Sequence, residues 1–256
     1  MKDWDVHINY GIKTGCNDAF IVDSVKRNEI LNNCITEEER QKTAEIIRPI
    51  LRVRDVCRYG YEWDNLWIIN THNGIKGDLE RIRIEDYPAI KQHLDKYWDK
   101  IEPRADQGDT AYNLRNCAYL DEFSKPKIIY PNMTKFLPFV YDRSGVMTNQ
   151  KCFIITGTHL EYLTAFFNSS LFKFCFADRF PELQGKTREL SKIFMDEISI
   201  LKINDTDECM INKLVQDIQM EYSVNKAKRI DKFIFDLYHL SIEEQMYIGF
   251  IDYGEK

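Results

Sequence analysis

The sequence of 256 residues predicts a mixed α+β fold, with a mixed-sheet domain over residues 1–203 and a helical tail over residues 204–256. Two observations predict it. Up to residue 203, short apolar runs typical of strands alternate with turn residues and helix-start signals. Beyond Asn204, apolar residues recur at helical spacing. The hydrophobic fraction of 44% is sufficient for a substantial core.

Strands are expected early in the chain. Residues 7–13 and 19–23 are short apolar runs, and Gly15 and Asn17 between them suit a tight turn. The apolar run at Leu66–Asn70 predicts a further, buried strand.

Two helices are expected in the same half of the chain. Thr36 and Glu39 have the spacing of a capping box, which predicts a helix through about Ile47 that Pro49 stops or turns. A second helix is expected to start near Tyr87, because one apolar stripe follows it: Ile90, Leu94, Tyr97, Trp98 and Ile101.

The second half begins with a polar, turn-rich stretch over residues 104–124. Strands are predicted at 125–131, at 152–157 and near Ile200. Thr158 and Glu161 form a second potential capping box, which predicts a helix to about Asn168. A group of phenylalanines is expected to be core rather than a base-stacking platform: Phe166, Phe167, Phe172, Phe174 and Phe176.

The tail is expected to be helical. Two helices are predicted by the spacing of Leu214, Val215 and Ile218 and of Ile230, Phe233, Ile234, Leu237 and Tyr238. Ser241 and Glu244 cap a third, short helix.

The charge distribution is uneven. The net charge of −6 argues against a nucleic-acid partner, but residues 41–60 carry five basic residues against two acidic ones, a local charge of +3. A basic face on an acidic molecule can still bind DNA, because the local electrostatic potential, and not the net charge, governs the attraction of the phosphates.

Several enzyme classes are excluded by missing motifs. No two glycines are separated by one residue, so neither a dinucleotide loop nor its methyltransferase counterpart is present. No two prolines are adjacent, and no Asp or Glu is followed two residues later by Lys. The sequence therefore lacks an amino-methyltransferase Asn-Pro-Pro-Tyr motif and a metal-nuclease half-motif.

The cysteines and the hydropathy pattern indicate a cytoplasmic protein. The seven cysteines form no C-x-x-C pair, so neither a zinc site nor a disulfide framework is expected, and no metal site is predicted. No apolar run approaches the roughly 20 residues of a membrane helix, and no signal-peptide core is found at the start. The chain reads as one that begins inside a larger protein.

Four blocks of the sequence resemble a known family in the family's own order. They cover residues 11–23, 46–60 and 103–131, and the last joins 176–194 to 230–245. Together they resemble the TaqI-like C-terminal specificity domain of adenine-specific DNA methyltransferases and of fused type IIG restriction-modification enzymes.

The resemblance implies a parent with an N-terminal domain that binds S-adenosylmethionine and methylates adenine N6 after base flipping, with or without endonuclease activity. This chain lacks that domain's motifs, so it is expected to be non-catalytic and to hold no cofactor. Its implied role is sequence-specific recognition of duplex DNA. Two alternatives remain open: a scaffold that docks methyltransferase to nuclease, and an enzyme with an unrecognised site.

The candidate DNA-binding residues have side chains suited to phosphates or base edges. They are Lys13, Thr14, Asn17, Arg52, Arg54, Arg58, Tyr59, Arg104, Gln107, Asn113, Arg115, Lys125 and Lys127. Gln107, Asn113 and Arg115 are the predicted base readers, and Lys125 and Lys127 the predicted phosphate contacts. Two alternatives are structural: Arg52 and Arg54 can pair with Asp55 or Glu45, and Asp106, Asn113 and Arg115 can form a buried polar network.

Overall fold

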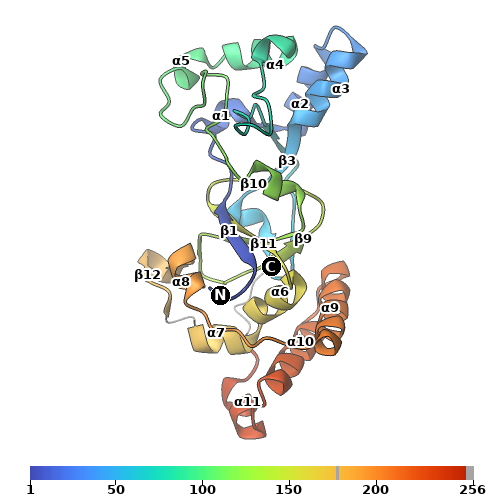
Figure 1. The fold of residues 1–256 in the computed structure, drawn as a ribbon, viewed down its shortest axis with the longest axis vertical. Helices are drawn as coiled ribbons and strands as arrows, with labels where there is room; N and C mark the ends of the chain where they lie inside the picture. Colours follow the sequence, from blue (N-terminus) through green and yellow to red (C-terminus); the bar gives the residue numbers. More distant parts are fainter. Residues whose placement is uncertain (177–178, 252–256) are drawn as a thin grey trace.

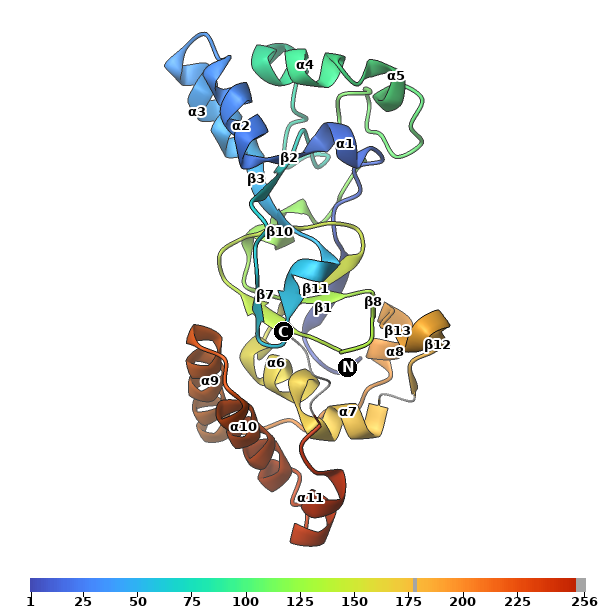
Figure 2. The ribbon, with the colours of Figure 1, turned by 180° about the vertical axis from the view of Figure 1, so that it is seen from behind.

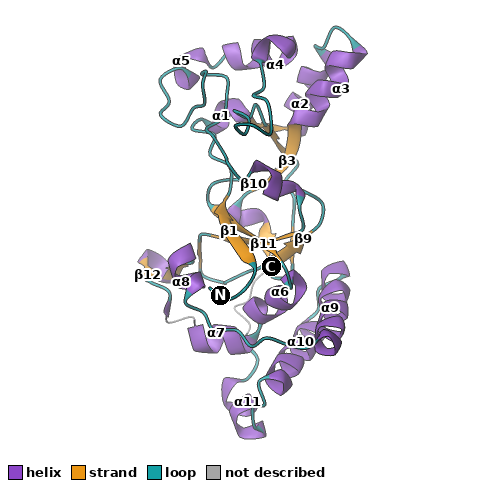
Figure 3. Cartoon of the chain, in the orientation of Figure 1, coloured by secondary structure: helices purple, strands orange, loops and turns teal. Residues whose placement is uncertain are grey.

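The computed structural model describes residues 1–176 and 179–251, and the molecule is elongated (Figures 1 and 2). One sheet lies near the middle of the long axis, with α2 to α5 at the upper end of Figure 1 and α6, α7 and α9 to α11 at the lower end. Figure 3 shows strands mainly between two helical ends. The mixed α+β class predicted from the sequence is confirmed.

The central sheet has four antiparallel strands in the order β1 (Val6–Tyr10), β11 (Cys152–Gly157), β7 (Lys127–Pro131) and β9 (Val140–Asp142). The strands predicted near residues 7–13, 125–131 and 152–157 are confirmed. Ile128 and Tyr130 of β7 belong to one hydrophobic core and Ile129 to another, because successive side chains of a strand point to opposite faces. Both faces of this sheet are therefore covered.

The upper end is built on a second, mixed sheet. Its order is β10 (Met147–Thr148), β3 (Ile47–Leu51), β6 (Leu66–Ile69) and β2 (Ile21–Asp23), with β10 parallel to β3 and the other pairs antiparallel. Its helices are α1 (Asn17–Phe20), α2 (Ser24–Asn32), α3 (Glu37–Ile46), α4 (Pro88–Asp95) and α5 (Trp98–Ile101). Their buried side chains, among them Ile50, Ile68 and Leu94, form the upper core.

The lower end is mostly helical. It contains α6 (Leu160–Asn168), α7 (Ser170–Phe176), α9 (Asp205–Met220), α10 (Val224–Leu237) and α11 (Ile242–Ile248). The smaller elements are β12 (Glu182–Leu183), β13 (Thr187–Glu189), β8 (Met133–Thr134), β4 (Val56–Cys57), β5 (Gly60–Tyr61) and α8 (Lys192–Asp196). Short 3-10 helices cover Val53–Asp55, Ile84–Asp86, Leu120–Ser124 and Gln184–Lys186.

The tail helices share the core of the central sheet. Val215 of α9 and Ile230 and Ile234 of α10 are buried in the lower core, together with Phe166 and Tyr130. The helical spacing seen in the sequence thus marks the face that packs against α6 and the sheet. Among the described residues, no helix combines the length and the apolar character needed to cross a membrane.

The phenylalanine group is mostly core. Phe166, Phe167 and Phe172 are buried, whereas Phe174 is exposed. The side chain of Phe176 lies outside the described residues.

Two predictions near the start of the chain need correction, one of a strand over residues 19–23 and one of the part played by Pro49. Residues 19–20 belong to the short helix α1 rather than to a strand, because the N–H groups of Ala19 and Phe20 both bond to the Cys16 carbonyl. A five-residue apolar run does not separate the two states. Helix α3 does begin at the Thr36 cap and end at Ile46, but Pro49 lies within strand β3.

The stripe from Ile90 to Ile101 is divided between α4 and α5, which break at Lys96 and Tyr97. Trp98, expected on the buried stripe, is more than one third exposed as a result.

Two predictions in the second half are wrong. Thr158 does not cap α6: His159 is the cap residue in a left-handed conformation (φ 58°), and the Thr158 hydroxyl donates to the Asp5 carbonyl instead. The segment near Ile200 is not a strand, because the backbone of Leu201 bonds to side chains. Its carbonyl accepts from the Tyr162 hydroxyl, and its N–H donates to the Tyr238 hydroxyl. The capping box at Ser241 and Glu244 is confirmed.

Candidate nucleic-acid interface

Two neighbouring hollows share the segment 116–118 as a common wall. The first hollow, of about 900 Å³, is lined by residues 73–81, Asp109 and this segment. The second hollow, of about 650 Å³, is lined by residues 10–13, 115–119 and Gln150. The walls come from loops that follow β1 and β6 and precede β7. Loops on a rigid scaffold are where binding residues concentrate.

Two exposed cations flank one carboxylate at the second hollow. Lys13 Nζ lies 3.5 Å from Asp106 Oδ2, and Arg115 Nη1 lies 2.9 Å from Asp106 Oδ1. The side chains of Lys13 and Arg115 are 45% and 55% exposed. Surface ion pairs of this kind contribute little stability, so both cations remain available to an anionic ligand. We call Lys13, Asp106 and Arg115 the basic triplet; its formal charge is +1.

Thr14 and Asn17 shape the turn before α1. The Thr14 hydroxyl donates to Asn17 Oδ1 at 2.6 Å, and Thr14 is buried while Asn17 is exposed. Gly15 between them has a φ of 65°, as expected for a turn glycine. Thr14 is therefore a turn residue, and Asn17 is the member of this pair that solvent reaches.

Arg104 is a buried clamp between loops. Its guanidinium donates to the carbonyls of Thr14, Ala111 and Asn113, at 3.0 Å for Ala111. The same group lies 4.3 Å from the centre of the Phe20 ring. Burial lowers the pKa of Arg104 to about 10. A guanidinium held in this way supports the loop and does not face a DNA phosphate.

Asn113 is buried within the same loop. Its Nδ2 donates to the Ile82 carbonyl at 2.9 Å, and its Oδ1 accepts from the Thr110 hydroxyl at 2.7 Å. The structural alternative thus describes Asn113 better than base reading does. Gln107 is half-buried, and its backbone pairs with Leu114 in an isolated bridge.

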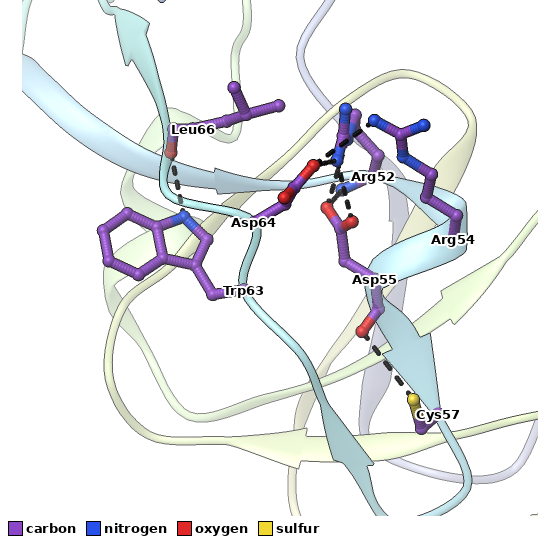
Figure 4. A network of polar contacts seen from close by, with 7 residues as sticks. All are labelled: Arg52, Arg54, Asp55, Cys57, Trp63, Asp64 and Leu66. Carbon is purple, nitrogen blue, oxygen red and sulfur yellow. Dashed lines mark hydrogen bonds and ion pairs between the residues drawn. The ribbon is translucent and has the colours of Figure 1, made fainter. Parts of the chain in front are cut away.

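Arg52 and Arg54 both pair with the exposed Asp64, and Arg52 also pairs with the buried Asp55 (Figure 4). Arg52 contacts Asp55 through Nη2 at 3.0 Å and Nε at 3.3 Å, and it also binds Asp64. Arg54 lies 3.3 Å from Asp64, and its side chain is 69% exposed. The hydrogen bond from Arg52 lowers the pKa of Asp64. Pairing with Asp55 therefore fixes Arg52, whereas Arg54 is held only loosely.

Arg58 and Tyr59 point into the protein. Arg58 is buried and donates through Nη2 to the Asn168 carbonyl at 2.6 Å. Tyr59 belongs to the lower core, where burial raises the pKa of its hydroxyl well above the ordinary value. Neither side chain faces a surface that DNA can reach.

Lys125 and Lys127 differ completely in exposure. Lys127 is fully buried, with its Nζ 2.6 Å from Asp142 Oδ2 and 2.8 Å from the Phe123 carbonyl oxygen. Burial lowers the pKa of Lys127. Lys125 is exposed and pairs with Asp121 and Glu122, whose hydrogen bonds raise its pKa. Of the two predicted phosphate contacts, only Lys125 lies at the surface.

Sequence reasoning missed a set of polar residues at the first hollow. Asn73 bonds to both Asp109 and Asn116, and Arg81 bonds to Asp109. The available signal was the pair Gly74 and Gly77, turn residues that stand among polar residues shortly after a buried strand.

Two comparisons with known proteins bear on this site. The family model described as "TaqI-like C-terminal specificity domain" matches residues 48–200, more than half of the chain.

Two solved structures have a similar fold. One is the type IIL restriction-modification enzyme MmeI in complex with DNA, at 10% identity and a TM-score of 0.67, covering 94% of this chain and 35% of that one. The other is the type IIG restriction endonuclease BpuSI, at 14% identity and a TM-score of 0.53, covering 91% of this chain and 30% of that one. The chain thus spans about one third of the length of each.

Proposed function

The chain belongs to the family of TaqI-like C-terminal specificity domains, and from this premise we propose that it recognises a specific sequence in duplex DNA. The observation that carries the proposal is the basic triplet, which presents two exposed cations beside a hollow large enough to admit part of a nucleic acid. Lys and Arg are the side chains that DNA-binding proteins use most for phosphates.

Within this proposal the candidate DNA-binding residues divide into an exposed class and a buried class. Lys13 and Arg115 contact phosphates and orient the duplex, so Arg115 takes a phosphate in place of the base edge predicted for it from the sequence. Arg54 and Lys125 are further exposed cations. The buried members of the predicted set, Arg58, Tyr59, Arg104, Asn113 and Lys127, support the scaffold instead.

The chemistry belongs, in this proposal, to another part of a longer protein. That part would bind S-adenosylmethionine and methylate adenine N6, with or without a nuclease attached. The described residues contribute recognition, and the partners of this chain are double-stranded DNA and the methyltransferase domain.

A docking scaffold is the second candidate function. Helix α11 has no buried side chain, and Ile242, Met246 and Tyr247 are among the most exposed apolar residues of the described chain. An exposed apolar patch of this kind is typical of a protein-binding surface. This function does not require duplex DNA to bind the chain itself.

Salt dependence of duplex binding tests the two functions. Each phosphate contact releases condensed counterions, so the slope of log K against log salt falls in magnitude by about 0.9 when one contact is lost. We expect this loss for Lys13→Ala and for Arg115→Ala. The matched controls, Lys213→Ala on α9 and Arg40→Ala on α3, are exposed residues on other surfaces and should leave the slope unchanged.

Two outcomes would count against DNA recognition. Equal slopes for the wild type and both test variants would remove the basic triplet from the interface. No duplex binding at low salt would favour the docking function.

A further inference from the structure

Asn73 ties together two loops at the first hollow. Its Nδ2 donates to Asp109 Oδ1 at 2.9 Å and also to Asn116 Oδ1, and its Oδ1 accepts from the Asp109 backbone N–H at 2.8 Å. We call Asn73, Asp109 and Asn116 the amide network. It joins the loop after β6 to the loop before β7.

The hydrogen bonds fix the orientation of both amides. A backbone N–H can only donate, so the Asn73 atom that faces it must be the carbonyl oxygen. The Asn73 nitrogen therefore faces Asp109 Oδ1 and Asn116, and the Asn116 atom that it meets must in turn be an oxygen. This leaves the Asn116 NH₂ group directed to other partners. Within the described part of the chain, this NH₂ group donates to no acceptor.

The network is held tightly. A Cβ on Gly108 would lie 2.5 Å from Asn73 Oδ1 and 2.7 Å from the Leu114 carbonyl oxygen, so only glycine permits this approach without displacement. Arg81 Nη1 holds Asp109 from the other side at 3.1 Å. A side chain positioned before binding loses less entropy when it meets its ligand.

The charge at the first hollow favours a neutral ligand group over a phosphate. Its lining includes two basic side chains, Lys76 and Arg81, and three acidic ones, Asp78, Glu80 and Asp109. A phosphate would be repelled by this lining, whereas the edge of a base would not. Asn116 lines both hollows and directly follows Arg115 of the basic triplet, so a base reader there stands beside a phosphate contact.

We infer that Asn116 reads an adenine of the target site, and that Asn73 positions it. This inference rests on the proposed function. In the major groove adenine alone presents an acceptor, N7, beside a donor, the N6 amino group. The free NH₂ of Asn116 donates to N7, and the second lone pair of its Oδ1 accepts from N6.

Selection of bound sequences from a pool of random duplexes tests this with the full 256-residue chain. The wild type should yield a motif that contains an adenine. Asn116→Asp replaces the donor by an acceptor, so we expect that one position to change towards cytosine while all others stay the same. A single bidentate contact of this kind discriminates by roughly 5- to 150-fold. Asn116→Ala should lose the preference without gaining a new one.

Asn73→Ala tests the positioning role. Its preference should weaken at the same position as in the Asn116 variants and at no other. The matched control is Asn32→Asp, an exposed asparagine at the end of α2. Its motif should equal that of the wild type, and thermal unfolding confirms that each variant is folded.

The outcomes separate the inference from the proposed function. If the wild type and Asn116→Asp select the same motif, Asn116 reads no base, although sequence-specific recognition stands. If the wild type itself selects no motif, the proposed function fails and the inference fails with it. If Asn73→Ala weakens every position equally, Asn73 has only a general structural role.

Discussion

Replacing Lys127 by methionine should destabilise the protein without changing its contacts with phosphate. Lys127 and Asp142 are opposite one another on β7 and β9, with side chains 0% and 1% exposed. Two unit charges 2.6 Å apart attract by about 6 kcal/mol at an effective dielectric constant of about 20. Desolvation of both ions offsets much of this gain, but removal of one ion leaves the other buried without a counter-charge.

The expected cost of Lys127→Met is about 3–5 kcal/mol. For a protein of this size a change of 1 kcal/mol shifts the melting temperature by about 2–4 °C, so the total shift is on the order of 10 °C. Urea and thermal unfolding followed by circular dichroism measure it. The double variant Lys127→Met/Asp142→Leu should recover most of the loss, because an apolar pair of similar volume replaces the ion pair.

The salt slope of DNA binding decides between a structural and a DNA-binding role for Lys127. The folded fraction of Lys127→Met should bind duplex DNA with the slope of the wild type. An unchanged free energy of unfolding, together with a salt slope lowered in magnitude by about 0.9, would mean that Lys127 contacts a phosphate and is not a buried structural residue.

Four further results are expected. Burial lowers the pKa of His93, so the unfolded chain binds a proton at this residue more readily than the folded chain does. Below pH 6.5 the free energy of unfolding should therefore fall by up to about 1.4 kcal/mol per pH unit. Urea unfolding at several pH values measures this fall, which should be smaller in His93→Gln. Gly108→Ala should displace Asn73, cost about 1–3 kcal/mol in urea unfolding and weaken base preference, whereas Gly60→Ala, with open space around it, should do neither. Ile230→Ala should cost about 2–5 kcal/mol in the same assay, against a few tenths for an exposed site. The isolated chain should not bind S-adenosylmethionine. A heat of binding in titration calorimetry at micromolar concentration would contradict this.

The regular elements could largely be predicted from the sequence, because burial of one face leaves a local period. Helix α10 follows such a period closely. The strands β7 and β11 are buried on both faces and are marked instead by short continuous apolar runs. The break between α4 and α5 could not be foreseen, since one apolar stripe runs across both.

The candidate site was harder to predict than the fold. Arg104 and Arg115 are of the same type and lie in the same turn-rich segment, yet one is buried against three carbonyls and the other is exposed. The difference depends on the position of Thr14 in the folded chain, because Arg104 donates to its carbonyl. A contact between residues so far apart in the sequence leaves no signal in the residues around Arg104. Lys127 did carry a signal: it stands two residues before Ile129 and so shares the face of a buried residue.

The central sheet determines which amide hydrogens exchange only by global unfolding and which parts of the chain tolerate substitution. Its strands β7 and β11 supply side chains to the cores on both sides, so their amide hydrogens should exchange with solvent only when the whole molecule unfolds. The loop over residues 72–82 contributes little to either core, and its amides should exchange through small local openings. Outside Asn73 and Gly74, substitutions in that loop can therefore accumulate at little cost in global stability, so a new base preference can evolve there while the sheet remains constant.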